Sequence, residues 1–436
     1  MNFLKTIEAK RDGQPLTNEQ IRQAVTDYAN GAIPDYQMSA FLMTVFFRGL
    51  SYEETRSLTL AMRDSGDTLE FPEEDRPIVD HTSTGGVGDK VPLLLAPLLA
   101  SLGFRVPSIS GRSLGIAGGP LDKLESIPGF LTALTGERIV EIVQNVGCCM
   151  AGQTAFMAPA DMRIYALRDV TGTIPSIPLI TSSILSRKLA ESVSALLVEV
   201  DFGRAGFMSD LESARELARN LVTVARESGV NARALLTHTD TPIGRTVGNW
   251  LEIREVVDSL EGKGPDDVRE LALHAAACLL EQTGRCSDLS SGLKLAEAEL
   301  ASGRPRRKWD ELLQAQGVHL EVFREKLASK RTAPVVRECV ASEPGFVTQC
   351  DALVIGELVR ELGGGRFRKE DIVDYEVGVD MLAKPGEAVS AGQVVGRVHA
   401  LSRDQAEEAL ARLKTAIVIG PEKPAESKPL IGETVA

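Results

Sequence analysis

The sequence contains little that would suit a secreted, metal-binding or membrane-spanning protein. Only six cysteines occur among its 436 residues, and none of them forms a C-x-x-C pair or has a nearby histidine that would complete a zinc site. Cys148 and Cys149 lie in an apolar run, so we expect buried free thiols. The N-terminus has no apolar core for export, and the longest apolar region, residues 91–104, contains prolines and is too short to cross a bilayer. We therefore expect a cytoplasmic protein with no membrane partner.

Basic residues are also fewer than acidic ones. The chain has 48 Lys and Arg against 61 Asp and Glu, which gives a formal net charge of −13. Such a balance argues against broad nucleic-acid binding, although it allows one small anionic substrate in a locally positive cleft. Hydrophobic residues make up 43% and charged residues 25%, as in globular proteins. The length exceeds that of one ordinary domain, so two or three lobes are expected.

The periodicity of the chain changes twice. Capping-box patterns at residues 17–20 and 51–54 each predict the start of a helix within a helical N-terminal segment. From residue 77, short apolar runs alternate with helical stretches, which is typical of a mostly parallel α/β sheet. Strand-like runs occur at 77–79, 106–109, 195–200 and 232–236, and helix-like runs at 91–102 and 210–228. After about residue 331, short β-like runs appear at 345–347, 372–379 and 392–398, and residues 421–429 suggest an extended strap.

These patterns predict an α/β fold with a small all-helical lobe, a mixed or parallel sheet flanked by helices, and a C-terminal α+β portion. We assign residues 1–65 and 160–193 to the helical lobe. Residues 66–159 and 194–335 form the predicted α/β lobe, and residues 336–436 form the predicted C-terminal domain.

The first candidate for a functional site is the segment DHTSTGGVGD at residues 80–89. Its glycines follow a strand-like run and precede a helix-like run. Glycines let backbone N–H groups approach an anion closely, and a following helix N-terminus adds positive potential. On its own, this motif is as consistent with a plain strand-to-helix turn as with an anion-binding loop.

Two further segments are candidates. Residues 110–125 form a long glycine-rich loop, which suggests either a functional role or a salt-bridged structural knot. Downstream, Tyr165 and Arg168 precede a helical stretch in which Ser183 and Arg187 share one face. An arginine beside a hydroxyl can bind a planar group that carries carbonyl oxygens, whereas a surface cation is the default interpretation.

Together these segments resemble the thymidine and pyrimidine-nucleoside phosphorylases. The loop at 110–125 runs into SIPGF at 126–130 and looks like the family signature, and GQT at 152–154, APAD at 158–161, SIPLI at 176–180 and KPG at 384–386 also match. The resemblance covers essentially the whole chain. It implies a homodimer of hinged lobes in which phosphate cleaves a pyrimidine nucleoside into free base and pentose 1-phosphate without a cofactor.

The resemblance places the base-binding residues on the helical side of the cleft. The family's arginine, serine and tyrosine fall on Arg168, Ser183 and Tyr165 and are retained. Its base-contacting lysine falls on Arg187, and its histidine near the base becomes Thr82.

The resemblance also implies an altered phosphate site. The phosphate lysine falls on His81, a second lysine falls on Asp201, and two hydroxyl donors fall on Pro92 and Pro120. The donors that persist are Ser83, Ser110 and the loop residues Thr84, Gly85 and Gly86. Each lost charge-assisted donor can cost about 1.5–3 kcal/mol. We therefore expect weak or absent phosphorolysis of thymidine, with phosphate or another anion or acceptor as the second substrate.

Some bacterial relatives hold a monovalent cation beside the glycine loop. Their ligand-bearing threonine falls on Lys90, and the acidic partner matches Glu252. We expect no metal here, because the Lys90 ammonium would take the place of the ion. The alternative is a Lys90 that points to solvent.

Three classes of function remain open from the sequence. The first is a pyrimidine-nucleoside phosphorylase with a modified anion site, and the second is a related pentosyltransferase or nucleoside hydrolase. The third is a non-catalytic nucleoside-binding homologue. Phosphoribosyltransferases of the anthranilate type have a similar fold and a Gly-Gly-Asp loop, but the sequence does not place the acidic metal-diphosphate ligands that they need.

Overall fold

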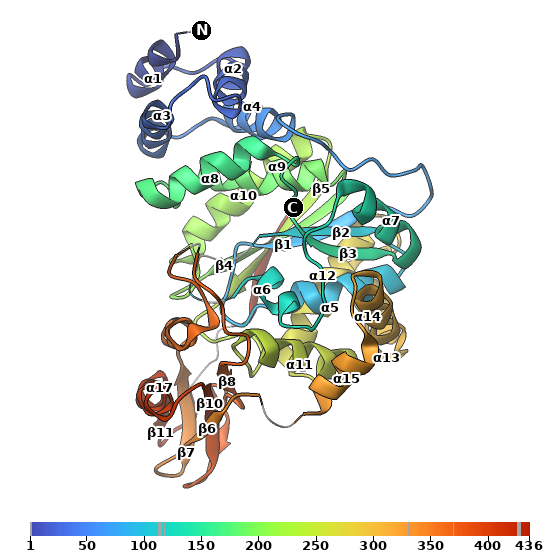
Figure 1. Ribbon diagram of the computed structural model, residues 1–436, viewed down its shortest axis with the longest axis vertical. Helices are drawn as coiled ribbons and strands as arrows, with labels where there is room; N and C mark the ends of the chain where they lie inside the picture. Colours follow the sequence, from blue (N-terminus) through green and yellow to red (C-terminus); the bar gives the residue numbers. More distant parts are fainter. Residues whose placement is uncertain (1, 112–115, 117, 330–331, 369, 425–428) are drawn as a thin grey trace.

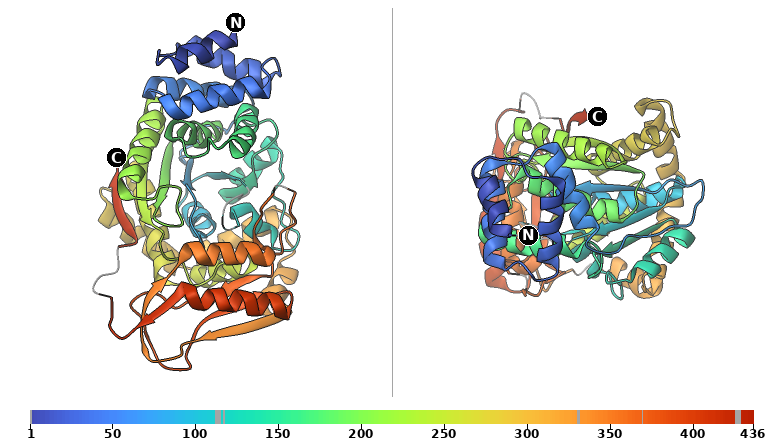
Figure 2. Two further views of the ribbon diagram at one scale, coloured as in Figure 1. Left: turned by 90° about the vertical axis from the view of Figure 1, so that its left-hand side faces the viewer. Right: turned by 90° about the horizontal axis from the view of Figure 1, so that it is seen from above.

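The computed structural model describes residues 2–111, 116, 118–329, 332–368, 370–424 and 429–436. A helical lobe and a C-terminal α+β portion lie at opposite ends of the molecule, with the α/β lobe between them (Figures 1 and 2). The predicted fold class is confirmed. Within the described part of the chain, none of the helices combines the length and hydrophobicity needed to traverse a bilayer.

The helical lobe is built from the N-terminal helices and two later ones. Its helices are α1 (Phe3–Arg11), α2 (Asn18–Ala29), α3 (Asp35–Arg48), α4 (Tyr52–Arg63), α8 (Pro159–Thr171) and α9 (Ile177–Ala190). Both predicted capping boxes are present, at Thr17 before α2 and at Ser51 before α4. Ala160, Ile164 and Leu179 of α8 and α9 share one apolar cluster with α1 to α4. Residues distant in the sequence therefore close this lobe around a common core.

The main sheet lies in the α/β lobe. Strands β1 (Val79–Ser83), β4 (Ala195–Phe202) and β5 (Asn231–His238) are parallel, so their carboxyl ends lie along one edge. A parallel pair, β2 (Val106–Ser110) and β3 (Cys148–Gly152), continues this layer through a bridge between Ile78 and Arg105. The two loops that the sequence singled out, after β1 and after β2, therefore begin at the same edge of the sheet.

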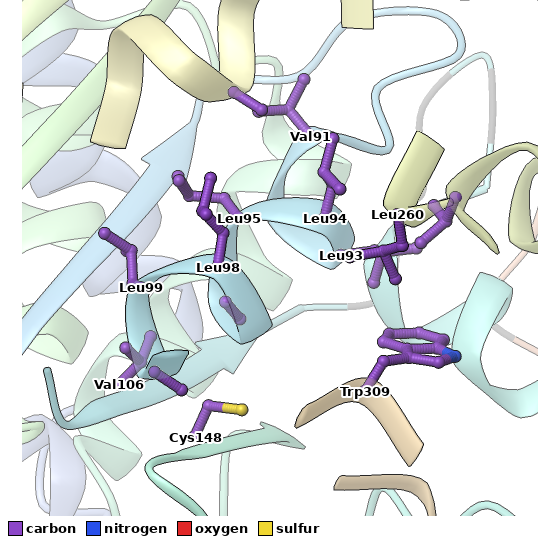
Figure 3. Packing of buried hydrophobic residues seen from close by; sticks show 14 of the residues in the cluster. Val91, Leu93, Leu94, Leu95, Leu98, Leu99, Val106, Cys148, Leu260 and Trp309 are labelled. Atoms are coloured by element: carbon purple, nitrogen blue, oxygen red, sulfur yellow. The ribbon is translucent and has the colours of Figure 1, made fainter. Parts of the chain in front are cut away.

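Helices cover the sheet on both sides (Figure 1). They are α5 (Val91–Ser101), α6 (Pro120–Glu125), α7 (Gly136–Val146), α10 (Leu211–Glu227), α11 (Asn249–Leu260), α12 (Asp266–Gln282), α13 (Leu289–Ala301), α14 (Arg304–Ala315) and α15 (Leu320–Ala328). Helix α5 is apolar on every side and buried from Val91 to Ala100, as expected of a helix that lies wholly inside a lobe. Figure 3 shows its leucines packed between Val106 of β2, Cys148 of β3 and Trp309 of α14. This central helix fixes the end of the glycine loop that precedes it, and strand β1 fixes its start.

The described residues of the C-terminal portion form two small antiparallel sheets and two α-helices. Its elements are β6 (Val335–Val340), β7 (Gly345–Cys350), α16 (Ala352–Val359), a π-helical turn η1 (Arg360–Gly364), β8 (Gly378–Asp380), β9 (Ala388–Val389), β10 (Val394–Ala400), α17 (Arg403–Ala416) and β11 (Ile417–Gly420). The predicted β-like run at 372–379 is wrong for most of its length. Its backbone instead makes bonds elsewhere, because the Asp374 N–H donates to Gly363 and the Tyr375 carbonyl accepts from Trp250.

The end of the chain returns to the main sheet. Residues 431–435, which the predicted boundaries place in the C-terminal domain, form strand β12 (Ile431–Val435) antiparallel to β5. Glu433 of this strand accepts two hydrogen bonds from Arg215 of α10, at 2.7 and 2.8 Å. The last strand therefore ties the C-terminal portion to the α/β lobe.

Replacing Leu98 by alanine should destabilise the protein, because this fully buried α5 side chain would leave a cavity in the core. We expect a loss of about 2–5 kcal/mol, measured as a lowered midpoint of urea unfolding. Leu295→Ala changes a 46% exposed residue of α13 and is the control. Equal shifts for the two variants would contradict the burial of α5.

Candidate active site

A cleft of about 340 Å³ lies at the carboxyl edge of the sheet, where it faces the helical lobe. Parallel α/β sheets commonly bind ligands at this edge. The cleft is lined by residues of the glycine loop, of the loop after β2, of α8 and α9, and of the turn after β4, among them His81, Thr82, Ser83, Thr84, Gly85, Gly86, Asp89, Pro92, Ser110, Pro120, Tyr165, Arg187 and Phe207. A second hollow of about 120 Å³ shares Ser83, Thr84, Tyr165, Arg187 and Phe207 with it and adds Arg168 and Ser183. The structure thus places all the predicted base-side and anion-side residues in two adjoining hollows.

Arg168 borders the smaller hollow but is itself part of the framework. Its side chain is 1% exposed, and it donates to the carbonyls of Leu179 at 2.9 Å and Ile174 at 2.7 Å, with a longer contact to Thr173 at 3.4 Å. Burial lowers the pKa of Arg168 to about 10, so the guanidinium stays charged at neutral pH. A guanidinium has five N–H donors, and the three used here leave two for a ligand in the hollow.

Ser183 and Arg187 lie one turn apart on α9 and present a hydroxyl and a guanidinium to the hollows. The Ser183 hydroxyl is buried and makes no hydrogen bond of ordinary geometry within the described residues. Arg187 donates through Nε to the Ser183 carbonyl at 3.1 Å and lies 3.6 Å from Asp161, a buried carboxyl whose pKa is raised by desolvation. The hydroxyl lies close enough to Asp161 to lower the pKa of that carboxyl, and its oxygen can still accept a hydrogen bond from a ligand. Ser183 is therefore a ready binding group.

On the opposite side, Asp201 occupies three donors of the glycine loop. The Asp201 carboxylate, at Oδ2, accepts from the Ser83 hydroxyl at 2.6 Å, from the Gly85 N–H at 3.1 Å and from the Thr84 hydroxyl at 3.3 Å. The Asp201 N–H donates back to Thr84 Oγ1 at 2.9 Å. Gly85 has a φ of 107°, which favours glycine, and this conformation turns its N–H toward the carboxylate. The loop that was predicted to hold an external anion thus holds an internal one.

Further carboxylates surround this loop. Glu199 and Asp201 are fully buried on β4, and Asp89 is nearly so at the end of the loop. Desolvation raises the pKa of both Glu199 and Asp201 well above the usual range, and the negative charge of Asp89 adds to each shift. Buried carboxyls therefore crowd the anion side of the cleft, and their raised pKa values favour the protonated, neutral form.

The lysines beside the cleft are already paired. Lys188 contacts Asp80 at 2.5 Å and Glu191 at 2.8 Å. Lys123 contacts Glu252 at 2.9 Å and donates to the Asp89 carbonyl. These pairs, together with an Arg366–Asp122 pair at 2.5 Å, favour the structural interpretation of the charged end of the loop at 110–125. Residues 112–115 and 117 of that loop lie outside the described part of the chain.

Lys90 is buried, so the solvent-facing alternative is wrong, and its acidic partner is not the predicted Glu252. The Lys90 ammonium lies 2.5 Å from Glu255 and donates to the carbonyls of Ile243 and Thr246, each at 2.9 Å. Glu252 lies one turn earlier on α11 and pairs with Lys123. Gly244 allows this packing, because a side chain at that position would overlap Glu255 and Lys90.

The comparisons with known proteins cover the chain from end to end. Residues 4–66 match the helical bundle domain of a glycosyl transferase family, residues 75–306 match its a/b domain, and residues 346–420 match the pyrimidine nucleoside phosphorylase C-terminal domain. Thymidine phosphorylase of Sinorhizobium fredii is 41% identical over 428 residues, which cover 98% of both chains. Pyrimidine-nucleoside phosphorylase of Geobacillus stearothermophilus is 38% identical over 413 residues, or 95% of each chain. The chain belongs to the thymidine and pyrimidine-nucleoside phosphorylase family.

Two further similarities extend this result. The mouse thymidine phosphorylase is 42% identical over 402 residues, which cover 90% of this chain and 85% of the mouse protein. Anthranilate phosphoribosyltransferase from Thermus thermophilus is similar in structure, with a TM-score of 0.56 over 71% of this chain and 98% of that one, at 18% identity. The second likeness shows a shared fold only.

Glu199 and Lys188 were not predicted from the sequence to lie near the cleft of this phosphorylase-family chain. One signal was available for Glu199. Strand β1 pairs with β4 in parallel, Ser83 opposite Glu199, and alternate residues of a strand share a face. His81, Ser83, Glu199 and Asp201 therefore lie on one face of the sheet, but only the strand register, which the sequence does not provide, reveals it.

The raised pKa of Asp201 makes a prediction about stability. A carboxyl whose pKa is higher in the folded than in the unfolded protein makes folding less favourable as pH rises above the unfolded value of about 4. Asp201→Asn removes this penalty and keeps an oxygen that can accept from Ser83 and Gly85. We expect the variant to gain stability relative to the parent between pH of about 5 and 8 and to lose the advantage near pH 4.

Thermal unfolding across this pH range measures the effect, with Asp169→Asn as the control because Asp169 is exposed on α8. A parent protein that stays as stable as Asp201→Asn at the upper end of the range would show that Asp201 is not a strained buried acid.

Proposed function

We propose that this protein cleaves the N-glycosidic bond of a pyrimidine nucleoside, with the base held by the helical lobe and the sugar directed toward the glycine loop. The observation that carries the proposal is the meeting of Arg168, Ser183, Arg187 and Tyr165 with the glycine loop across two adjoining hollows. In phosphorolysis, phosphate would attack the anomeric carbon and release a pentose 1-phosphate. The enzyme's main work would be to position the reactants and to stabilise charge on the departing base.

The base side is equipped for a flat ring with carbonyl oxygens. Arg168 uses three of its five N–H donors in carbonyl contacts. The Ser183 hydroxyl makes no hydrogen bond of ordinary geometry, although it lies close enough to Asp161 to lower the pKa of that carboxyl. Arg187 supplies positive charge where the two hollows meet. A site built to pair with polar substrate atoms rejects analogues that leave its groups unpaired.

The residues on the phosphate side of the cleft support weak binding of phosphate. Asp201 already accepts from Ser83, Thr84 and Gly85. Pro92 and Pro120 line the cleft without offering hydroxyl donors. A phosphate would have to displace the Asp201 carboxylate and then lie beside other buried acids. We therefore propose an altered anion site that binds phosphate poorly.

We also propose a homodimer, because apolar side chains are exposed on the helical lobe. Leu4 of α1 is 51% exposed, and Tyr36 and Phe47 of α3 are 74% and 76% exposed. Exposed apolar groups gathered on neighbouring helices favour a partner surface. The six free cysteines support a reducing, cytoplasmic setting. The lobe boundaries predicted from the sequence remain our proposal for the hinged units, except that residues 431–435 join the α/β lobe.

Titration calorimetry tests the assignment of the two sides. We expect uracil to bind and inorganic phosphate to bind much more weakly. Ser183→Ala should weaken uracil binding about 2- to 10-fold, the loss expected for one hydrogen bond, without lowering thermal stability. Ser186→Ala on the same helix is the matched control, because its hydroxyl bonds to the Ser183 carbonyl and does not line the hollow. Tight phosphate binding, or no effect of Ser183→Ala on uracil, would contradict the proposal.

The Lys90 ammonium is proposed to take the place of a monovalent cation. It is surrounded by two carbonyls, the Thr246 hydroxyl and the Glu255 carboxylate, which are oxygen ligands of the kind that hard cations prefer. The thermal stability of the parent protein should therefore be the same in potassium chloride and in choline chloride at equal ionic strength. Lys90→Thr should be less stable and should regain stability specifically in potassium.

Lys263→Thr, at an exposed lysine, serves as the control for Lys90→Thr. A Lys90→Thr protein that responds equally to potassium and to choline would refute the substitution of an ion by the ammonium.

A further inference from the structure

The C-terminal portion has no part in the proposed binding of base or phosphate, yet its apolar core reaches the cleft. Val87 of the glycine loop and Ala205 of the turn after β4 both line the cleft. Both side chains are buried in one apolar cluster with residues of the C-terminal portion, among them Val347 of β7 and Ile355 of α16. Val247, just before α11, belongs to the same cluster. The C-terminal portion therefore holds two loops of the anion side.

The loop after β2 is in contact with the same portion. A side chain at Gly356 of α16 would come within 2.9 Å of Ile116, so this helix packs closely on the loop. Asn249 donates to the carbonyl of Gly364 in η1 at 2.9 Å, and a side chain at Gly118 would overlap Asn249. Ile116 and Gly118 also line the cleft. This part of the loop thus lies between the cleft and the packing that involves α16 and η1.

A buried ion pair completes the contact. Arg366, which follows η1, donates to one oxygen of Asp122 at 2.5 Å, and the other oxygen accepts from the Gly119 N–H at 3.0 Å. Asp122 is fully buried, and Arg366 is 8% exposed. Gly119 and Pro120 line the cleft, whereas Arg366 is not among the residues that line either hollow. One carboxylate therefore joins the C-terminal portion to the wall of the cleft.

We propose that the C-terminal portion holds the anion-side wall of the cleft in place, and that Arg366 is the positioning residue that acts on Gly119 and Pro120 through Asp122. This role rests on the proposed function, because it takes that wall to face the reacting sugar.

The wall needs such a support because its backbone is intrinsically free. Glycine has the widest choice of backbone conformations, and two glycines precede Pro120 in this wall. Within the α/β lobe, Lys123 ties α6 to α11 through Glu252 at 2.9 Å, but it does not bond to the glycines. Asp122 does bond to Gly119, and a charge-assisted hydrogen bond from Arg366 fixes that carboxylate more strongly than a neutral donor would.

The test measures amide hydrogen exchange and base release in the full-length protein. In Arg366→Gln, we expect peptides that cover residues 118–126 to exchange roughly 10-fold faster or more, because a charge-assisted hydrogen bond no longer opposes local opening. The kcat for release of base from uridine and thymidine at high phosphate should fall about 10- to 100-fold, as expected when a cleft wall moves by about an ångström. Uracil affinity by calorimetry should stay unchanged, since the base-side groups belong to α8 and α9. Arg368→Gln, at an exposed arginine of the same segment, is the matched control.

Two further variants separate positioning from folding. Arg366→Gln leaves the Asp122 carboxylate unpaired in the interior, which destabilises a fold. Combining Arg366→Gln with Asp122→Asn removes that charge, and the new amide oxygen can still accept from the Gly119 N–H. We expect this double variant to melt close to the parent and to keep the fast exchange and the low kcat of the single variant. Arg366→Lys keeps the charge but not the forked geometry, so its kcat should lie between those of the parent and of Arg366→Gln.

Parent-like exchange at residues 118–126 in the folded double variant would refute the positioning role. A uracil affinity that falls as far as kcat does would also refute it, because the whole cleft would then be disturbed. A parent protein that binds uracil but releases base from neither nucleoside would refute the proposed function. In that case the exchange measurement still decides the role of Arg366, since it needs no turnover.

Discussion

The cleft depends on one internal interaction, the bond between the Asp201 carboxylate and the donors of the glycine loop. Glycine loops at the carboxyl end of a strand satisfy an anion with backbone N–H groups and hydroxyls, and these groups are costly to leave unpaired when partly buried. Asp201 meets the requirement from within the chain through Ser83, Thr84 and Gly85. The loop is therefore ordered without an external ligand, and the same contacts remove its capacity to bind one.

On the helical side, too, residues that hold the fold together also line the cleft. Arg168 ties the end of α8 to the start of α9 by binding the carbonyls of Ile174 and Leu179. Its remaining donors and the Ser183 hydroxyl lie on helices whose apolar faces belong to the core of the helical lobe. Because rigid elements hold these groups, little ordering would remain for a bound ring to impose. The two sides of the cleft therefore differ. The helical side keeps free hydrogen-bond donors, whereas on the other side Ser83, Thr84 and Gly85 already donate to Asp201.

The sequence predicted the parts of the fold that are encoded locally. The capping boxes at Thr17 and Ser51 and the alternation of apolar runs gave the helical lobe and the parallel strands. Features that depend on distant pairing were not predictable in this way. Strand β12 was not predicted, because its partner, β5, lies about 200 positions earlier and the sequence alone does not report such a pairing.

The candidate site shows the same division. Family motifs located the side chains of the cleft, and the charge change at Asp201 was visible in the sequence. The hydrogen bond from Ser83 to Asp201 was not visible in the sequence. It joins residues 118 positions apart, and predicting it requires the register of two strands. The acidic partner predicted for Lys90 was wrong by one helical turn. Glu252 and Glu255 both lie on α11, and only the packing around Gly244 selects Glu255. Given that packing, the charges of the cleft are determined: its lysines are matched by acids, while Glu199 and Asp201 are left among carboxyls with raised pKa values. Carboxyls with raised pKa values hold their protons, and the neighbouring Lys123 and Lys188 are already paired with acids, so this wall of the cleft has little positive charge to offer a phosphate.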